Sequence, residues 1–110
     1  MDGCVFCRIA SGELPSTVVH QDDEFLAFED VQPRAEHHLL VVPRAHFDNL
    51  DAFVSAGGSG ERMLQFVGAT ARTRGLAGRY RLITNVGEDA GQVVPHLHWH
   101  VLAGSGLPGF

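Results

Sequence analysis

The sequence predicts one α+β domain built on a mostly antiparallel sheet of five strands. Five short runs of apolar and β-branched residues are bounded by turn residues, which is typical of strands. Only one segment has both the length and the apolar stripe of a full helix, and the connections between segments are short. Because 110 residues suit one small domain, we expect residues 1–110 to form a single unit.

The first half of the chain is expected to contain a short N-terminal element and three strands. Residues 4–11 are predicted to form a short helix or turn. The strands are predicted over residues 17–20, 25–28 and 38–42. Polar residues 21–24 end the first strand, and Pro43 stops the third because proline cannot donate to a sheet ladder.

The second half is expected to contain the main helix and the last two strands. The helix is predicted over residues 61–74: Ser59 or Gly60 can cap its start, and Gly75 can close its end. Its apolar stripe is formed by Met63, Leu64, Val67 and Ala71. The final strands are predicted over residues 80–86 and 96–102, and a glycine-rich loop joins them.

Composition limits the classes of partner. The formal net charge is −5, and all eight basic residues are scattered arginines, so a nucleic-acid partner is not expected. A small anionic ligand is still compatible, because a few local donors suffice. The start of the chain lacks a basic and apolar leader, and no apolar stretch approaches membrane-spanning length. We therefore expect a cytoplasmic protein without a membrane partner.

Three alternating histidines occupy the last predicted strand. A strand places successive side chains on opposite faces, so His96, His98 and His100 should share one face, with neighbours roughly 6.6 Å apart. The residues between them, Leu97, Trp99 and Val101, should face the core.

This pattern has three interpretations. It can be a solvated polar face, a three-histidine metal centre, or a catalytic group in which one imidazole attacks phosphorus while its neighbours orient it. Histidine suits the last role because its neutral form is nucleophilic and abundant near pH 7. Spacing alone does not separate the metal centre from covalent catalysis.

The surrounding sequence resembles the histidine triad (HIT) family. Residues 96–102 match the family's alternating histidine motif, and residues 91–94 (GQVV) match the segment upstream of it. Residues 38–46 (HLLVVPRAH) are similar to the family's H-x-L-V-φ-P-K-x-H segment, and residues 6–15 and 28–33 also match. The resemblance covers nearly the whole chain. It implies a HIT-like fold and is nearest to the nucleoside phosphoramidase branch, the histidine triad nucleotide-binding proteins.

The resemblance also implies roles for four histidines. His98 matches the nucleophile that attacks the α-phosphate and forms a nucleotidyl-histidine intermediate, from which water releases a nucleoside monophosphate. His100 matches the residue that contacts the phosphate or the leaving group. His96 and His38 match members of the hydrogen-bond relay that fixes the nucleophile.

A nucleotide site is implied in the same way. Asp30 matches an acidic residue that accepts the ribose hydroxyls, and Asn85, Gly91, Gln92 and Val93 belong to the segment that approaches the phosphate. The apolar slot around the base, expected to be a purine, corresponds to Phe6, Ile9, Leu14, Phe28, Val31 and Leu40. Val93 departs from the family, which commonly has serine or threonine there, so one hydroxyl donor is missing; such a loss can cost about 2.7–4 kcal/mol in a transition state.

The only two cysteines form a C-x-x-C pair, Cys4 and Cys7. On their own they could bind a metal, cycle as a dithiol or be inert, and a thioredoxin-like role lacks its βαβ context. Some bacterial HIT members carry this pair and bind a structural zinc. By that resemblance, His46 and His96 would complete a Cys₂His₂ site.

The sequence thus predicts a hydrolase of nucleoside 5′-phosphoramidates or related nucleotidyl conjugates, without a catalytic cofactor. The close alternative is cleavage of dinucleoside polyphosphates. An alternative of another class is a zinc-braced nucleotide-binding module with little turnover, which the Val93 departure keeps open. A homodimer is expected from the family and from the small size of the domain.

Overall fold

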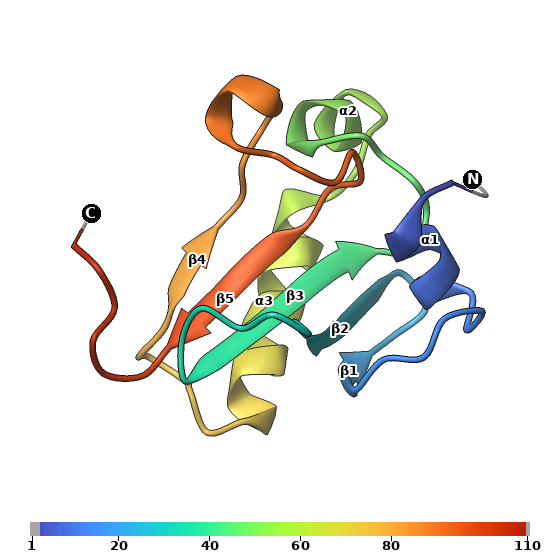
Figure 1. Cartoon of the computed structure of the whole chain (residues 1–110). Helices are drawn as coiled ribbons and strands as arrows, with labels where there is room; N and C mark the ends of the chain where they lie inside the picture. Colours follow the sequence, from blue (N-terminus) through green and yellow to red (C-terminus); the bar gives the residue numbers. More distant parts are fainter. Residues whose placement is uncertain (1–2, 110) are drawn as a thin grey trace.

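The computed structural model describes residues 3–109 and contains a single five-stranded sheet. The strands are β1 (Val18–Gln21), β2 (Phe25–Glu29), β3 (His37–Pro43), β4 (Arg81–Ile83) and β5 (Trp99–Ala103). Their spatial order is β1-β2-β3-β5-β4, and every neighbouring pair is antiparallel. The predicted α+β class with an antiparallel five-stranded sheet is confirmed (Figure 1). The predicted unit of residues 1–110 includes residues 1, 2 and 110, which lie outside the described part.

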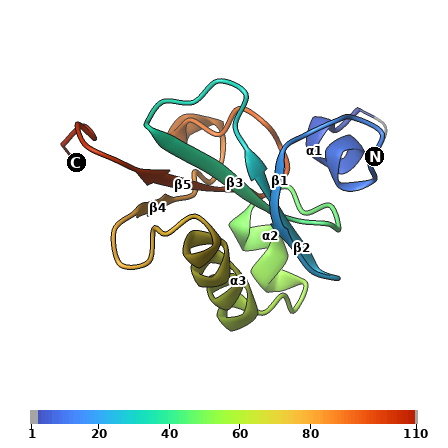
Figure 2. The same cartoon turned by 90° about the horizontal axis from the view of Figure 1, so that it is seen from below.

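Helices cover both faces of the sheet. The main helix, α3 (Gly60–Thr73), and the shorter α2 (Leu50–Ser55) lie on one side, whereas α1 (Val5–Ala10) lies against the other face (Figure 2). Ser59 caps α3 by accepting the backbone N–H of Arg62 at 3.1 Å, as the sequence predicted. Among the helices described between residues 3 and 109, none is both long and apolar enough to span a membrane.

Strict alternation along the central strand divides the core into two layers. Leu39 and Val41 of β3 pack toward α3, and Leu40 and Val42 pack toward α1. The α3 side is closed by the buried side chains of Phe25, Ala27, Phe53, Met63, Phe66, Val67, Leu97 and Val101. The α1 side contains Phe6, Leu26 and Phe28.

The structure adds one helix and corrects the bounds of two strands. The helix α2 is absent from the prediction because its six residues are too few for a helical period; Asn49 starts it by accepting the N–H of Ala52 at 2.9 Å. Strand β4 covers only residues 81–83, and β5 begins at Trp99 rather than at residue 96. The ladder is interrupted because the N–H of Leu97 bonds Phe47 O at 2.7 Å and the Thr84 hydroxyl bonds His98 O at 2.8 Å.

Candidate active site

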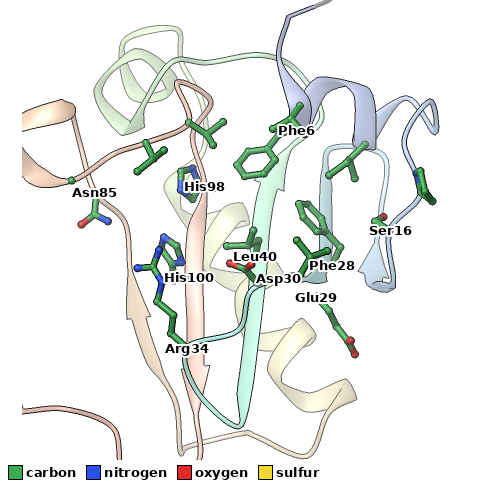
Figure 3. A pocket seen from close by; sticks show the side chains of 17 residues that line it. Phe6, Ser16, Phe28, Glu29, Asp30, Arg34, Leu40, Asn85, His98 and His100 are labelled. Carbon is green, nitrogen blue, oxygen red and sulfur yellow. The ribbon is translucent and has the colours of Figure 1, made fainter.

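A cavity of about 320 Å³ opens on the α1 face of the sheet. Its walls come from α1, the loop after β2, strand β3, the loop that precedes β5, and β5 itself (Figure 3). The structure brings most of the predicted nucleotide-site residues to these walls: Phe6, Ile9, Phe28, Asp30, Val31, Leu40, Asn85, Gly91, Val93, His98 and His100.

His98 presents one free ring nitrogen to this cavity. Its side chain lies immediately before β5 and is 7% exposed, and its Nδ1 lies 2.8 Å from the carbonyl oxygen of His96. A carbonyl oxygen can only accept, so Nδ1 carries the hydrogen and Nε2 keeps its lone pair. Burial lowers the pKa of His98, which favours the neutral, nucleophilic ring near pH 7.

His100 is oriented by a second histidine on the adjacent strand. The backbone N–H of Arg34 donates to His38 Nδ1 at 3.0 Å, so the hydrogen of neutral His38 is on Nε2. His38 Nε2 therefore donates to His100 Nδ1 at 2.9 Å, which leaves the His100 hydrogen on Nε2. Burial lowers the pKa of His38 and, together with its histidine neighbours, lowers the pKa of His100 to about 4. Both rings are neutral at pH 7.

Asp30 follows β2 and reaches the same group. Its Oδ1 accepts the backbone N–H of Gln32 at 2.8 Å, and its Oδ2 lies 3.4 Å from His38 Nε2. The carboxylate also lines the cavity, between the histidine pair and the apolar wall. It is therefore placed to accept hydrogen bonds from a ligand.

The four predicted metal ligands come together beside the cavity. Cys4 Sγ lies 3.2 Å from His96 Nδ1, and Cys7 Sγ lies 3.3 Å from His46 Nδ1 and 3.5 Å from His96 Nδ1. All four ligand atoms lie within 4.8 Å of one another. Zn–S and Zn–N bonds at a tetrahedral angle would separate sulfur from nitrogen by about 3.5 Å, so the arrangement fits such an ion.

The Nε2 atoms of His96 and His46 also form hydrogen bonds. His96 Nε2 donates to Pro43 O at 3.0 Å, and His46 Nε2 donates to Asp48 Oδ1 at 2.9 Å. These bonds place the lone pairs on the Nδ1 atoms, toward the thiols, as the outer shell of a metal site requires. The His96 ring thus points away from the cavity, and only the carbonyl oxygen of His96 contacts the ring of His98 through a hydrogen bond.

The loop before β5 forms one wall of the cavity. Gln92 does not line the cavity: its amide is 9% exposed and bonds Asp48 O at 2.6 Å, Val94 O at 3.0 Å and Gly87 N at 2.8 Å. Gly91 has a φ of 94°, which a side chain would strain. Within residues 3–109, the backbone N–H groups of Val93 and Val94 have no hydrogen-bond partner, and both residues line the cavity.

Two further differences concern the cavity walls. Leu14 lies outside the cavity, in a shallow groove next to Arg44, so the structure does not place it in the base slot. Arg34 lines the cavity although the sequence analysis did not select it, because no motif or run of charge marks its position. Its spacing from Asp30 in a loop after a strand was the only available signal.

An antiparallel sheet that carries alternating histidines at a nucleotide-sized cavity defines the histidine triad class of fold. The HIT domain profile matches residues 11–107, so the chain belongs to the HIT family. It is 38% identical to Protein HitA of Neisseria gonorrhoeae over 93% of this chain and 96% of that protein.

Solved structures agree with this assignment. A HIT family hydrolase from Clostridium thermocellum superposes with a TM-score of 0.87 at 36% identity, covering 100% of this chain and 97% of that one. A histidine triad protein from Clostridium difficile gives a TM-score of 0.84 at 40% identity, covering 100% and 96%. The fold is that of HIT family hydrolases.

Proposed function

We propose that this protein hydrolyses nucleotidyl conjugates at the α-phosphorus, with nucleoside 5′-phosphoramidates and related conjugates as substrates. One observation supports this most directly. His98 has its Nδ1–H bound to a backbone carbonyl 2.8 Å away, so its unprotonated Nε2 is available to a ligand in the cavity. A fixed neutral imidazole of this kind is an activated nucleophile.

The proposed reaction has two steps. His98 Nε2 attacks phosphorus, a P–N bond to the ring forms, and the bond to the leaving group breaks. Water then attacks the nucleotidyl-histidine, breaks that P–N bond and releases the nucleoside monophosphate; overall, the water supplies the leaving group's proton. His100 Nε2–H and the free N–H groups of Val93 and Val94 are the donors available to the phosphoryl oxygens.

The remaining walls fit a nucleoside. Asp30 would accept the ribose hydroxyls, and the apolar wall of Phe6, Ile9, Phe28, Val31 and Leu40 would hold a purine. His38 is a positioning residue, because it acts on the substrate only through His100.

Replacement of the nucleophile tests the mechanism. His98→Ala should lower kcat on an adenosine 5′-phosphoramidate by at least about 10⁴-fold. His37→Ala, a histidine replacement outside the cavity, is the matched control and should keep wild-type turnover. A nucleotidyl-histidine is stable in base and labile in acid, so rapid quenching in base with a substrate labelled in the nucleotide should trap label on the wild-type protein only, and acid should release it. Full activity of His98→Ala would exclude the mechanism, and tight binding without turnover in the wild type would favour a nucleotide-binding module.

We further propose that Cys4, Cys7, His46 and His96 hold a structural zinc ion. The Cys₂His₂ donor set and the spacing of its atoms support this assignment. When bound, the ion would brace the α1 segment against the loop after β3 and the segment before β5, and no reaction step needs it. Elemental analysis should give one zinc per chain, and Cys4→Ser should abolish it.

A homodimer and a cytoplasmic location are also proposed. A domain of 110 residues buries a small share of its surface, so association with a second copy would add stability. Light scattering at several protein concentrations tests the dimer, and fractionation of cells tests the location.

A further inference from the structure

Arg34 places a positive charge at the cavity, next to the histidine pair. The residue lies in the loop between β2 and β3, and its side chain extends to the ring of His100 (Figure 3). Its backbone N–H donates to His38 Nδ1 at 3.0 Å, which anchors this part of the loop. The side chain therefore starts from a fixed point and reaches the phosphate side of the cavity.

Within the described part of the chain, no acidic side chain forms an ion pair with Arg34. Three residues with a formal charge line the cavity, namely Glu29, Asp30 and Arg34. Glu29 pairs with Arg74 at 2.6 Å, and Asp30 lies 3.4 Å from His38. Within residues 3–109, the guanidinium of Arg34 forms neither an ion pair nor a hydrogen bond. Among the side chains that line the cavity, Arg34 is the one with a permanent positive charge.

The position of Arg34 indicates which part of a ligand it would contact. The apolar wall and Asp30 are on the side assigned to the nucleoside, and His98 and His100 flank the assigned position of phosphorus. Arg34 is exposed, so its guanidinium lies toward solvent, where a leaving group extends. Val93 also lines the cavity, is 84% exposed and offers no side-chain donor, so Arg34 is the charged side-chain donor available to a leaving group.

We infer that Arg34 binds an anionic substituent of the leaving group, and that the preferred substrates are nucleotidyl conjugates whose leaving group carries a carboxylate or a phosphate. The inference rests on the proposed hydrolysis at His98. The planar guanidinium can bind either anion through two parallel hydrogen bonds, which is the shared chemistry of the two substituents. Arg34 is thus a specificity-determining residue.

Matched substrates test this assignment. One pair is an adenosine 5′-phosphoramidate of an amino acid and of the corresponding amino acid amide, which differ only in the carboxylate. A second pair is the phosphoramidate of an amino alcohol with and without a phosphate on its hydroxyl. Wild-type kcat/KM should favour the anionic member of at least one pair by about tenfold or more, and the two pairs identify which anion fits.

Arg34→Gln should reduce this preference to about one. Arg72→Gln is the control, because it removes the same charge from the exposed side of α3 and should keep the wild-type preference. Arg34→Lys should keep part of it, since an ammonium retains the charge but not the planar pair of donors. The wild-type preference should also shrink as salt is raised.

Several results would overturn the inference. An equal loss of kcat/KM on both members of a pair would show that Arg34 serves the α-phosphate or the loop instead. A wild-type enzyme without any preference would exclude an anionic leaving group. Binding of the same conjugates to His98→Ala, with and without Arg34→Gln, gives a second measurement: if hydrolysis itself fails, a preference in Kd that depends on Arg34 still supports the anion site, and its absence refutes it.

Discussion

Removal of the proposed zinc ion is expected to affect stability much more than chemistry. A ligand that binds only the folded state stabilises it by about 2.7 kcal/mol when its free concentration is 100 times its Kd. Unfolding entropy near 2.1 cal/mol/K per residue gives about 0.23 kcal/mol/K for 110 residues. Zinc buffered at that level should therefore raise Tm by about 12 °C relative to the chelated protein.

Catalysis should respond less than stability to removal of zinc, because His96 has a hydrogen bond that does not involve the ion. Its Nε2 donates to Pro43 O at 3.0 Å without the metal, and the group that orients His98 is the backbone carbonyl of His96 rather than its ring. At a temperature where the chelated protein is folded, we expect kcat to stay within about tenfold of the zinc-loaded value. This expectation differs from that of a catalytic metal, whose removal would abolish turnover.

Thermal melts in zinc buffers, with parallel single-temperature rates, provide the assay. Cys7→Ser should lose the zinc-dependent rise in Tm, whereas Ser11→Ala, at the other end of α1, should retain it. Cobalt substitution should give thiolate-to-metal absorption in the wild type and not in Cys7→Ser. A wild-type Tm that does not depend on zinc would refute the metal site, and loss of turnover in the folded, metal-free protein would refute its purely structural role.

Three other predictions concern the surroundings of the site. The pKa of His100 is lowered to about 4, so the unfolded chain takes up a proton at this residue before the folded protein does as pH falls. The free energy of unfolding should therefore decrease between pH 6.5 and 4, with about 3 kcal/mol of the decrease due to His100. Urea titrations at several pH values should show a flatter pH profile for His100→Gln. Gln92→Ala should lower the free energy of unfolding by about 1–3 kcal/mol and reduce turnover, because it leaves the Gly87 N–H and the Asp48 carbonyl without their hydrogen-bond partner. Gln65→Ala, exposed on α3, should change neither in the same melts and assays. Gly104→Ala should cost about 1–3 kcal/mol in chemical denaturation, since φ is 117° and the new Cβ would lie 2.7 Å from Glu36 Cβ, whereas Gly109→Ala meets no neighbour and should be silent.

Local patterns predicted the sheet well because the apolar residues of each strand indicate which of its faces are buried. Residues 39–42 are continuously apolar, and β3 is indeed the central strand with both faces covered. The six-residue α2 could not be predicted in this way. Its position depends on the Asn49 cap and on the burial of Phe53 at 2% exposure, which a short window does not reveal.

The site was predictable only where residues repeat in a pattern. Alternation identified His96, His98 and His100, and family resemblance linked Cys4 and Cys7 to histidines far along the chain. Neither source could place Arg34 or the inward turn of the Gln92 amide. Both depend on how loops fold over the sheet, and the periodicity of the sequence does not predict loop conformation.

The three alternating histidines have different surroundings because each meets a different partner on the same face. The His96 ring meets two thiols from α1, and the His98 ring meets the carbonyl oxygen of His96. His100 meets His38, which is its diagonal neighbour, since Leu102 is the residue paired with His38. The contact between His100 and His38 depends on the register between β3 and β5. A shift of one residue would turn His100 toward α3, where the chain provides an apolar layer in place of His38. Burial of Leu97 and Val101 against α3 opposes that shift, so packing on one face of β5 fixes the chemistry on the other.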